Sequence, residues 1–328
     1  MNSGFIKKLV KELISDLSPR QREVIEGRYG LKGGEELTLA AVGDRYGLTR
    51  ERIRQIERAA LNSIESKFAN GSGVKFVSAV NDIFKKFRGV REEALLVGDL
   101  RCASADLNNI RFALEASSKF NHQPEDDDFY SFWYVDNIAK KQANDFISKL
   151  KAQLKNVRAA NNDYKPGDEW ESNCVAVSKH FATSPFGQFG LREWPEIVPQ
   201  NSREWAYLIL KKNKQPMHFT ELAKVIDDYR QTHRKTNAQT VHNELIKDER
   251  FVLVGRGTYG LRELGLLPGT AKEVMAHFIK KNGPLHSRDL IKLVLKERMF
   301  KENTLLINLQ NRESFQRLQD GRYDVREV

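Results

Sequence analysis

The sequence has few of the residues that build disulfide scaffolds and no run long enough to span a membrane. Its 328 residues include only two cysteines, Cys102 and Cys174, which are far apart and have no second Cys or His at metal-ligand spacing. This pattern excludes a disulfide framework and indicates isolated, reduced thiols. No stretch approaches the ~20 apolar residues of a membrane helix, and residues 1–15 lack the apolar core of a secretory signal. We therefore expect a cytoplasmic protein with no membrane partner.

Catalytic and cofactor motifs are also missing, so we expect a binding protein and not an enzyme. The acidic run at residues 125–128 (EDDD) lacks metal-loop spacing. The segment 255–260 (GRGTYG) matches the dinucleotide fingerprint, but a strand pattern follows it where that fingerprint needs a helix. A turn between two strands is the better interpretation. His218 and His286 stand at equivalent places in a repeat without a nearby nucleophile, so we interpret them as packing or hydrogen-bonding residues. No cofactor and no metal is expected.

What the chain does have is positive charge, concentrated towards its two ends. The formal net charge is +10 and the pI is about 9.4. Residues 201–328 hold 24 Lys and Arg against 16 Asp and Glu, residues 1–73 hold 13 against 10, and residues 74–200 are close to neutral. Such a distribution favours polyanionic partners. The length and the 40% hydrophobic content allow two to four modules.

Residues 37–63 (LTLAAVGDRYGLTRERIRQIERAALNS) carry the pattern of a helix-turn-helix. A short helix over residues 39–46 is followed by a turn at Gly47, and Thr49 is placed to cap a second helix that begins at Arg50. An apolar stripe recurs along that second helix at steps of three and four: Ile53, Ile56, Ala60 and Ile64. The second helix should therefore bury one face and expose the other.

The exposed face of this second helix carries side chains that suit the edges of bases. It consists of Arg50, Glu51, Arg54, Gln55 and Arg58. Arginine fits the acceptors of guanine, glutamine fits adenine, and glutamate accepts from cytosine. The alternative is an ordinary solvated face, because Arg and Glu are common on any helix surface.

Three segments resemble region 4 of bacterial primary-type sigma factors. They are residues 17–31 (LSPRQREVIEGRYGL), 38–43 (TLAAVG) and 49–57 (TRERIRQIE). The resemblance covers about the first fifth of the chain, and it implies docking on the promoter −35 element and on the flap of RNA polymerase. Carried over by position, it implies base contacts by Arg50, Glu51, Arg54 and Gln55. It also implies positions near the DNA backbone for Thr38, Leu39, Thr49 and Arg58.

The glycine-rich stretch 70–73 (NGSG) predicts a linker between a first domain, residues 1–69, and a second, residues 74–136. The second domain should contain an amphipathic helix, two shorter helices and an aromatic strand (FYSFWY), which could form a winged-helix-like module with an irregular wing. Residues 137–200 should connect it to the C-terminal part. Their helical pattern, residues 137–160, could be a connecting rod, a partner-binding helix or a helix that packs on its own protein.

The C-terminal part repeats itself, with one copy in residues 201–265 and a second in residues 268–328. Both copies contain KKN followed by PMHFTEL or PLHSRDL, and they close with GTYGLREL or GRYDVREV. A third such ending, GQFGLREW, occupies residues 187–194. The pattern predicts three helices and a two-stranded wing in each copy, with Thr220 capping the second helix of the first copy.

The first copy resembles the HARE-type helix-turn-helix domain of the delta subunit of bacterial RNA polymerase. The resemblance rests on residues 219–223 (FTELA), 240–245 (TVHNEL) and 251–261 (FVLVGRGTYGL). That subunit ends in an acidic tail, whereas this chain continues into a second basic copy. A secondary nucleic-acid or partner surface is expected at the third helices and the wing: Asn237, Thr240, Asn243, Arg256, Asn303 and Thr304.

Together these patterns predict a mainly α protein with an N-terminal helix-turn-helix followed by tandem winged helix-turn-helix modules with short β-hairpin wings. The expected partners are promoter-like double-stranded DNA and RNA polymerase core. No segment resembles the sigma region that melts the −10 element, so an accessory transcription factor associated with the nucleoid is expected, not a complete sigma factor. A regulator independent of polymerase and a structural nucleoid protein are the alternatives.

Overall fold

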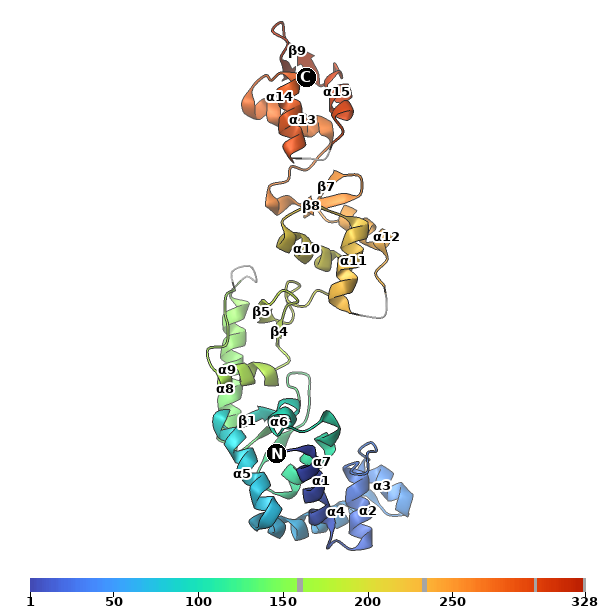
Figure 1. Cartoon of the computed structure of the whole chain (residues 1–328), viewed down its shortest axis with the longest axis vertical. Helices are drawn as coiled ribbons and strands as arrows, with labels where there is room; N and C mark the ends of the chain where they lie inside the picture. Colours follow the sequence, from blue (N-terminus) through green and yellow to red (C-terminus); the bar gives the residue numbers. More distant parts are fainter. Residues whose placement is uncertain (158–161, 232–234, 298–299, 327–328) are drawn as a thin grey trace. The chain divides into compact units, whose positions relative to one another are not determined.

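The computed structural model describes residues 1–157, 162–231, 235–297 and 300–326. The chain forms two compact units, Met1–Glu193 and Trp194–Val328. Both consist mainly of helices with small antiparallel sheets of two or three strands (Figure 1). The predicted fold class is therefore confirmed. Among the described residues, no helix combines the length and apolarity needed to cross a bilayer.

The N-terminal helix-turn-helix begins the first unit, and local sequence signals set its helix ends. Its helices are α1 (Ser3–Ile14), α2 (Pro19–Arg28), α3 (Leu39–Tyr46) and α4 (Arg50–Glu65). Ser18 and Gln21 form a reciprocal capping box at the start of α2. Gly47 ends α3 in the left-handed conformation, with φ of 63°. Thr49 then caps α4, as predicted.

A winged module follows directly. Its elements are η1 (Ser66–Ala69), α5 (Gly71–Lys86), β1 (Val90–Glu92), α6 (Glu93–Asp99), η2 (Ser104–Asp106), α7 (Leu107–Ala116), β2 (Asn121–Gln123) and β3 (Phe132–Tyr134). The strands form one antiparallel sheet in the order β1-β3-β2. The acidic residues 125–128 lie between β2 and β3, so they belong to the wing of this module.

The predicted linker at residues 70–73 is wrong. Helix α5 begins at Gly71, immediately after η1, and Gly73 is buried inside its first turn. A Cβ atom at Gly73 would lie 2.6 Å from the carbonyl oxygen of Lys67 and 2.7 Å from the Cα of Phe68. Glycine is needed here for close backbone packing and not for flexibility. The helix-turn-helix and the winged module are therefore joined without a gap.

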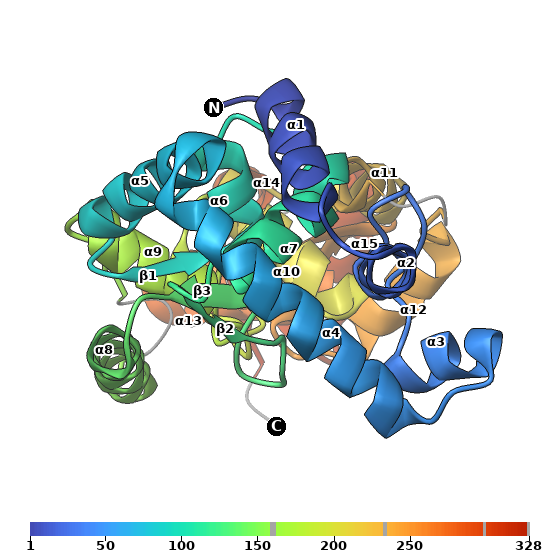
Figure 2. The ribbon, with the colours of Figure 1, turned by 90° about the horizontal axis from the view of Figure 1, so that it is seen from below.

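Helix α4 belongs to two hydrophobic cores. Near its start, Ile53 packs with Val24 and Val42 in a small core of the helix-turn-helix. Near its end, Ala60 and Ile64 enter a larger core. That larger core contains α1 and the winged module, and α7 packs beside both α1 and α4 (Figure 2). Burial at both ends fixes the direction of α4 within this unit.

The rest of the first unit packs around one long helix. Its elements are α8 (Asn137–Lys155), α9 (Glu169–Val177), β4 (Phe181–Thr183) and β5 (Phe189–Leu191). The predicted stripe of α8 is buried at Ala143, Ile147, Leu150 and Leu154, so this helix packs on its own protein. The last part of the predicted helix, residues 158–161, lies outside the described residues. The ending at residues 187–194 contributes β5, which pairs with β4 in a hairpin.

The second unit contains two copies of one arrangement. The first has α10 (Ser202–Asn213), β6 (Met217–His218), α11 (Phe219–Arg230), α12 (Ala238–Ile246), β7 (Phe251–Gly255), β8 (Thr258–Leu261) and η4 (Arg262–Leu264). The second has α13 (Ala271–Asn282), α14 (Ser287–Glu297), α15 (Glu302–Leu309), β9 (Phe315–Arg317) and β10 (Tyr323–Val325). Residues 327–328, which end the second predicted repeat, lie outside the described residues.

Two details of the first copy decide between the alternatives that the sequence left open. The GRG segment forms the turn of the β7–β8 hairpin, so no helix begins at the glycines. His218, and not Thr220, caps α11, and its side chain accepts a hydrogen bond from the backbone N–H of Thr220. Thr220 lies inside the first turn, where its hydroxyl is 2.7 Å from Nδ1 of His218. The repeated histidine is therefore a local hydrogen-bonding residue in this copy.

Replacing Leu9 by Ala tests whether α1 and the winged module share one core. Leu9 is 1% exposed within the larger core, so we expect the free energy of unfolding of the full chain to fall by roughly 2–5 kcal/mol. Amide hydrogen exchange should accelerate in α7 as well as in α1. The control is Lys8→Ala on the exposed side of the same helix, which should change neither quantity. Faster exchange confined to α1 would contradict a shared core.

Candidate nucleic-acid interface

The predicted reading face of α4 lies on its solvent side. Arg50, Glu51, Arg54, Gln55 and Arg58 are all exposed, whereas Ile53, Ala60 and Ile64 are buried behind them. Ile56, the remaining member of the predicted stripe, is partly buried against the small core. The fold therefore brings the predicted base-reading side chains together on one open surface.

Within this face, neighbouring side chains are bonded to one another. Nε of Arg54 donates to Oε2 of Glu51 at 2.9 Å, and its Nη2 donates to Oε1 at 2.7 Å. The hydrogen bond from Arg54 holds the pKa of Glu51 below its ordinary value. Because a guanidinium has five N–H donors, three of those of Arg54 remain for another acceptor. Glu51 thus orients Arg54 at the surface while leaving part of it open.

Arg52 is a member of this surface that sequence reasoning missed. It is exposed, and its Nη1 donates to Oε1 of Gln55 at 3.2 Å. The two residues are three positions apart, a spacing at which side chains on a helix meet. That spacing was the available signal. Gln55 keeps its amide N–H₂ group as a free donor in this pairing, since Arg52 uses only the amide oxygen.

The residues expected near the DNA backbone lie at the starts of α3 and α4. The hydroxyl of Thr38 accepts from the N–H of Ala41 at 3.1 Å, and that of Thr49 accepts from the N–H of Arg52 at 3.2 Å. Each hydroxyl is exposed and retains its own hydrogen for donation. Leu39 is half-buried against the small core, so only its backbone is suited to a polar contact.

Charged contacts between helices hold α4 in place. Nε of Arg28 on α2 lies 2.9 Å from Oε1 of Glu57 on α4, and Nη1 of Arg28 donates to the carbonyl oxygen of Leu37. On the neighbouring side, the guanidinium of Arg20 lies 3.8 Å from the ring centre of Tyr46 at the end of α3. These contacts join all three helices of the helix-turn-helix.

The winged module of the first unit offers no comparable reading surface. The residues of its third helix, α7, are largely buried against α1 and α4: Ile110, Phe112, Ala113, Leu114 and Ala116. Its acidic wing is held by Lys179, whose Nζ lies 2.6 Å from Oε1 of Glu125 and 2.7 Å from the carbonyl oxygen of Asp126. An acidic wing repels phosphate, so this module supports α4 and does not itself suit DNA.

A buried carboxylate ties the helix-turn-helix to this winged module. Glu93 is 5% exposed and accepts from Nη2 of Arg111 at 2.6 Å and from Nε1 of Trp133 at 3.0 Å. Arg111 also forms an ion pair with Glu36, in the segment before α3. The sequence carries no signal for this cluster, because Glu36 and Arg111 are 75 positions apart.

The secondary surface predicted for the second unit is also exposed. Asn237 caps α12 by accepting from the N–H groups of Gln239 and Thr240. Thr240, Asn243 and Arg256 are exposed on α12 and on the β7–β8 turn. Asn303 and Thr304 are exposed at the start of α15 in the second copy. Each group lies on a third helix or a wing, as predicted.

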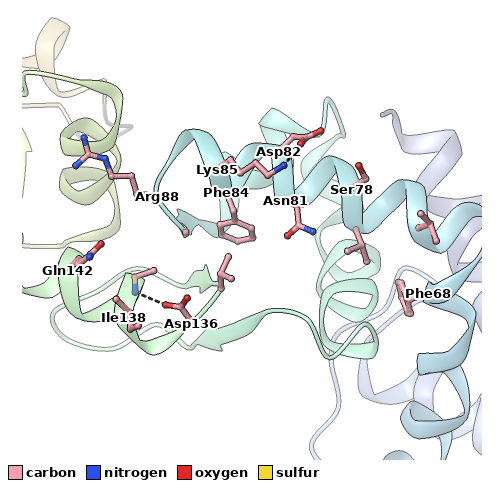
Figure 3. A pocket seen from close by; sticks show the side chains of 15 residues that line it. Phe68, Ser78, Asn81, Asp82, Phe84, Lys85, Arg88, Asp136, Ile138 and Gln142 are labelled. Atoms are coloured by element: carbon pink, nitrogen blue, oxygen red, sulfur yellow. Dashed lines mark hydrogen bonds and ion pairs between the residues drawn. The ribbon is translucent and has the colours of Figure 1, made fainter.

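A groove of about 680 Å³ lies along α5 and the start of α8, with Phe84 on its floor (Figure 3). Its charged side chains are already engaged, since Lys85 pairs with Asp82 at 3.5 Å and Asp136 accepts from the N–H of Ala139 at 2.8 Å. It therefore contains no free acid–base pair. In the part of the chain that the structure describes, no three His, Cys, Asp or Glu side chains could hold a metal ion.

Comparison with known proteins identifies two domains. Residues 13–65 match the family model described as sigma-70, region 4. Residues 203–264 match the HARE-HTH family model, which describes a helix-turn-helix domain of ASXL and restriction endonuclease proteins. Both are of DNA-binding type, and together they support a DNA-binding, transcription-related protein. Both resemblances inferred from the sequence are confirmed.

Several sigma factors are similar to the N-terminal part of this chain. RNA polymerase principal sigma factor HrdD of Streptomyces coelicolor is 50% identical over 62 residues, which are 19% of this chain and 18% of that protein. RNA polymerase sigma-B factor of Nostoc is 48% identical over 52 residues, 16% of each chain. The chloroplastic sigma factor sigF of Arabidopsis thaliana is 44% identical over 52 residues, 16% of this chain and 10% of that protein. The chain thus spans less than a fifth of the length of each.

Replacing Glu93 by Gln tests the buried cluster through pH. Burial raises the pKa of Glu93, but hydrogen bonds from Arg111 and Trp133 outweigh it, so the pKa lies below 4.5, its ordinary value. The carboxylate therefore contributes stability above about pH 4.5, which is lost as the pH falls through the lower folded-state pKa. We expect Glu93→Gln to lower the free energy of unfolding by about 3 kcal/mol at neutral pH, because Arg111 loses its buried partner.

Urea unfolding at about pH 6 and about pH 3 is the measurement, since the variant should lose less stability on acidification than the parent protein. Glu35→Gln, at an exposed position near Glu36, is the matched control and should behave as the parent at both pH values. An equal loss on acidification in parent and variant would show that Glu93 does not couple to folding.

Proposed function

We propose that this protein recognises a specific double-stranded DNA site through α4 and acts as an accessory factor of RNA polymerase. The observation that carries the proposal is the exposed row Arg50, Glu51, Arg54 and Gln55 on a helix anchored in two cores. We assign site reading to residues 1–69 and structural support to residues 74–136 and 137–200. Secondary contacts are assigned to residues 201–265 and 268–328.

The proposed chemistry is hydrogen bonding without any reaction. The three free N–H groups of Arg54 suit guanine O6 and N7, the amide of Gln55 suits adenine, and Glu51 suits the amino group of cytosine. Each good bidentate contact discriminates against the wrong base by roughly 1–3 kcal/mol. Arg58 and the hydroxyls of Thr38 and Thr49 would contact phosphates, which position the helix without reading sequence.

The proposed polymerase association rests on the similarity to region 4. The similar proteins bear the names of RNA polymerase sigma factors, and the matched residues 13–65 include all of α2, α3 and α4. Two other functions remain as competitors. One is a regulator that reads operators without touching polymerase, and the other is a nucleoid protein that coats DNA with little regard to sequence.

The variants Arg54→Ala and Arg58→Ala separate base reading from phosphate contact. A preferred site is first selected from random duplex DNA with the full chain, and affinities are then measured on that site and on a scrambled duplex. Arg54→Ala should lose roughly 1–3 kcal/mol on the selected site and little on the scrambled one. Arg58→Ala should weaken both about equally and reduce the salt slope by about one.

Lys141→Ala, at an exposed position on α8, is the control and should leave both affinities unchanged. An equal, small loss for Arg54→Ala on both duplexes would support sequence-blind coating and defeat site reading.

Co-purification with RNA polymerase core tests the second half of the proposal. The full chain carrying an affinity tag is mixed with purified core enzyme in the absence of DNA, and the bound fraction is measured against salt. We expect a stable complex, which Arg54→Ala leaves intact because that side chain faces away from the cores. Site-specific DNA binding without any bound core would favour the regulator that acts independently of polymerase.

A further inference from the structure

The two copies in the second unit share one order of elements but present different outward surfaces. Aligning Thr240 and Leu245 with Thr304 and Leu309 places Asn243 of α12 opposite Ile307 of α15. The same alignment of the closing segments places Arg256, on the first wing turn, opposite Asp320 on the second. The second copy thus has an apolar residue and an acid where the first has an amide and a base.

The third helix of the second copy exposes large apolar side chains. Ile307 is 68% exposed and Leu306 is 39% exposed, while Leu305 and Leu309 are buried in the core beneath them. An isoleucine can contact a thymine methyl group but makes no hydrogen bond to a base edge. At the second wing turn, Asp320 is paired with Arg322 at 2.6 Å, so this turn offers no net positive charge to a phosphate.

Helix α14, which packs against α15 over the same core, supplies a basic stripe beside this apolar surface. Arg288, Lys292 and Lys296 recur at steps of four and are exposed. Leu295, 40% exposed, lies two turns from Arg288 and therefore on the same side. Within the described residues, none of the three cations makes an ion pair with another side chain.

We propose that the outward faces of α14 and α15 form a docking surface for an acidic amphipathic helix of another protein. Ile307, Leu306 and Leu295 would take its apolar side, and Arg288, Lys292 and Lys296 would pair with its carboxylates. Charge complementarity selects this occupant, because a second copy of the same basic surface would be repelled. The proposal does not depend on DNA reading by α4, which lies in the other unit.

Fluorescence anisotropy with the full chain and two synthetic peptides tests this proposal. One labelled peptide carries Leu at helical spacing of three and four with Glu on its other face, and the second has Lys in place of every Glu. We expect the Glu peptide to bind and the Lys peptide not to bind. Ile307→Ser and the double change Lys292→Glu with Lys296→Glu should each weaken binding of the Glu peptide by tenfold or more.

The first copy offers a matched control. Ile246 on α12 is 62% exposed, so Ile246→Ser removes an isoleucine of similar exposure and should leave peptide binding unchanged. All the substituted side chains are exposed, and circular dichroism would verify that each variant keeps its helical content. Equal losses for Ile246→Ser and Ile307→Ser would reduce the effect to general stickiness and overturn the proposal.

Two other occupants are read from the same variants. Loss of duplex DNA binding on Ile307→Ser, measured in a chain that also carries Arg54→Ala, would reassign the surface to nucleic acid. A dimer in sedimentation velocity that Ile307→Ser dissociates would reassign it to a second copy. Since Arg54 and Ile307 lie in different units, failure of this proposal and failure of DNA reading by α4 are measured separately.

Discussion

Burial of the two ends of α4 in two different cores is the constraint on which the rest of the first unit depends. Ile53 belongs to the small core of the helix-turn-helix, and Ala60 and Ile64 belong to the core that α1 shares with the winged module. A helix held at both ends cannot rotate about its axis without exposing one of these side chains. The outward direction of Arg54 and its neighbours therefore follows from packing on the opposite face.

The winged module explains why so small a helix-turn-helix can be rigid. Its third helix, α7, spends its surface on packing against α1 and α4, and the Arg111 guanidinium reaches Glu36 in the segment before α3. Its acidic wing is bound to Lys179 and does not extend freely. A fold that often contacts nucleic acid is here a support for another helix. Fold alone thus does not indicate which module reads DNA.

The second unit shows the same principle in a duplicated form. Both copies keep buried residues at equivalent places, as Leu245 and Leu309 illustrate. Their exposed residues are freer to change, because a substitution on the solvent side costs little stability. Asn243 and Ile307 stand at equivalent positions on α12 and α15 but offer different chemistry. One polar and one apolar surface on the same scaffold are consistent with two kinds of partner.

The sequence by itself determined what local interactions decide: the capping box of Ser18 and Gln21, the stop at Gly47, the cap at Thr49 and the buried stripe of α4. These signals act within about four residues, so they can be read along the chain, and they placed Arg50, Glu51, Arg54 and Gln55 on one face. Only the tertiary structure decided the role of Gly73, which adjoins the backbone of Lys67 and Phe68 where a linker was predicted. It also decided the joining of Glu36, Glu93 and Arg111, which are far apart in the chain. Such contacts depend on how whole helices pack, and burial that brings distant residues together leaves no periodic trace in the sequence.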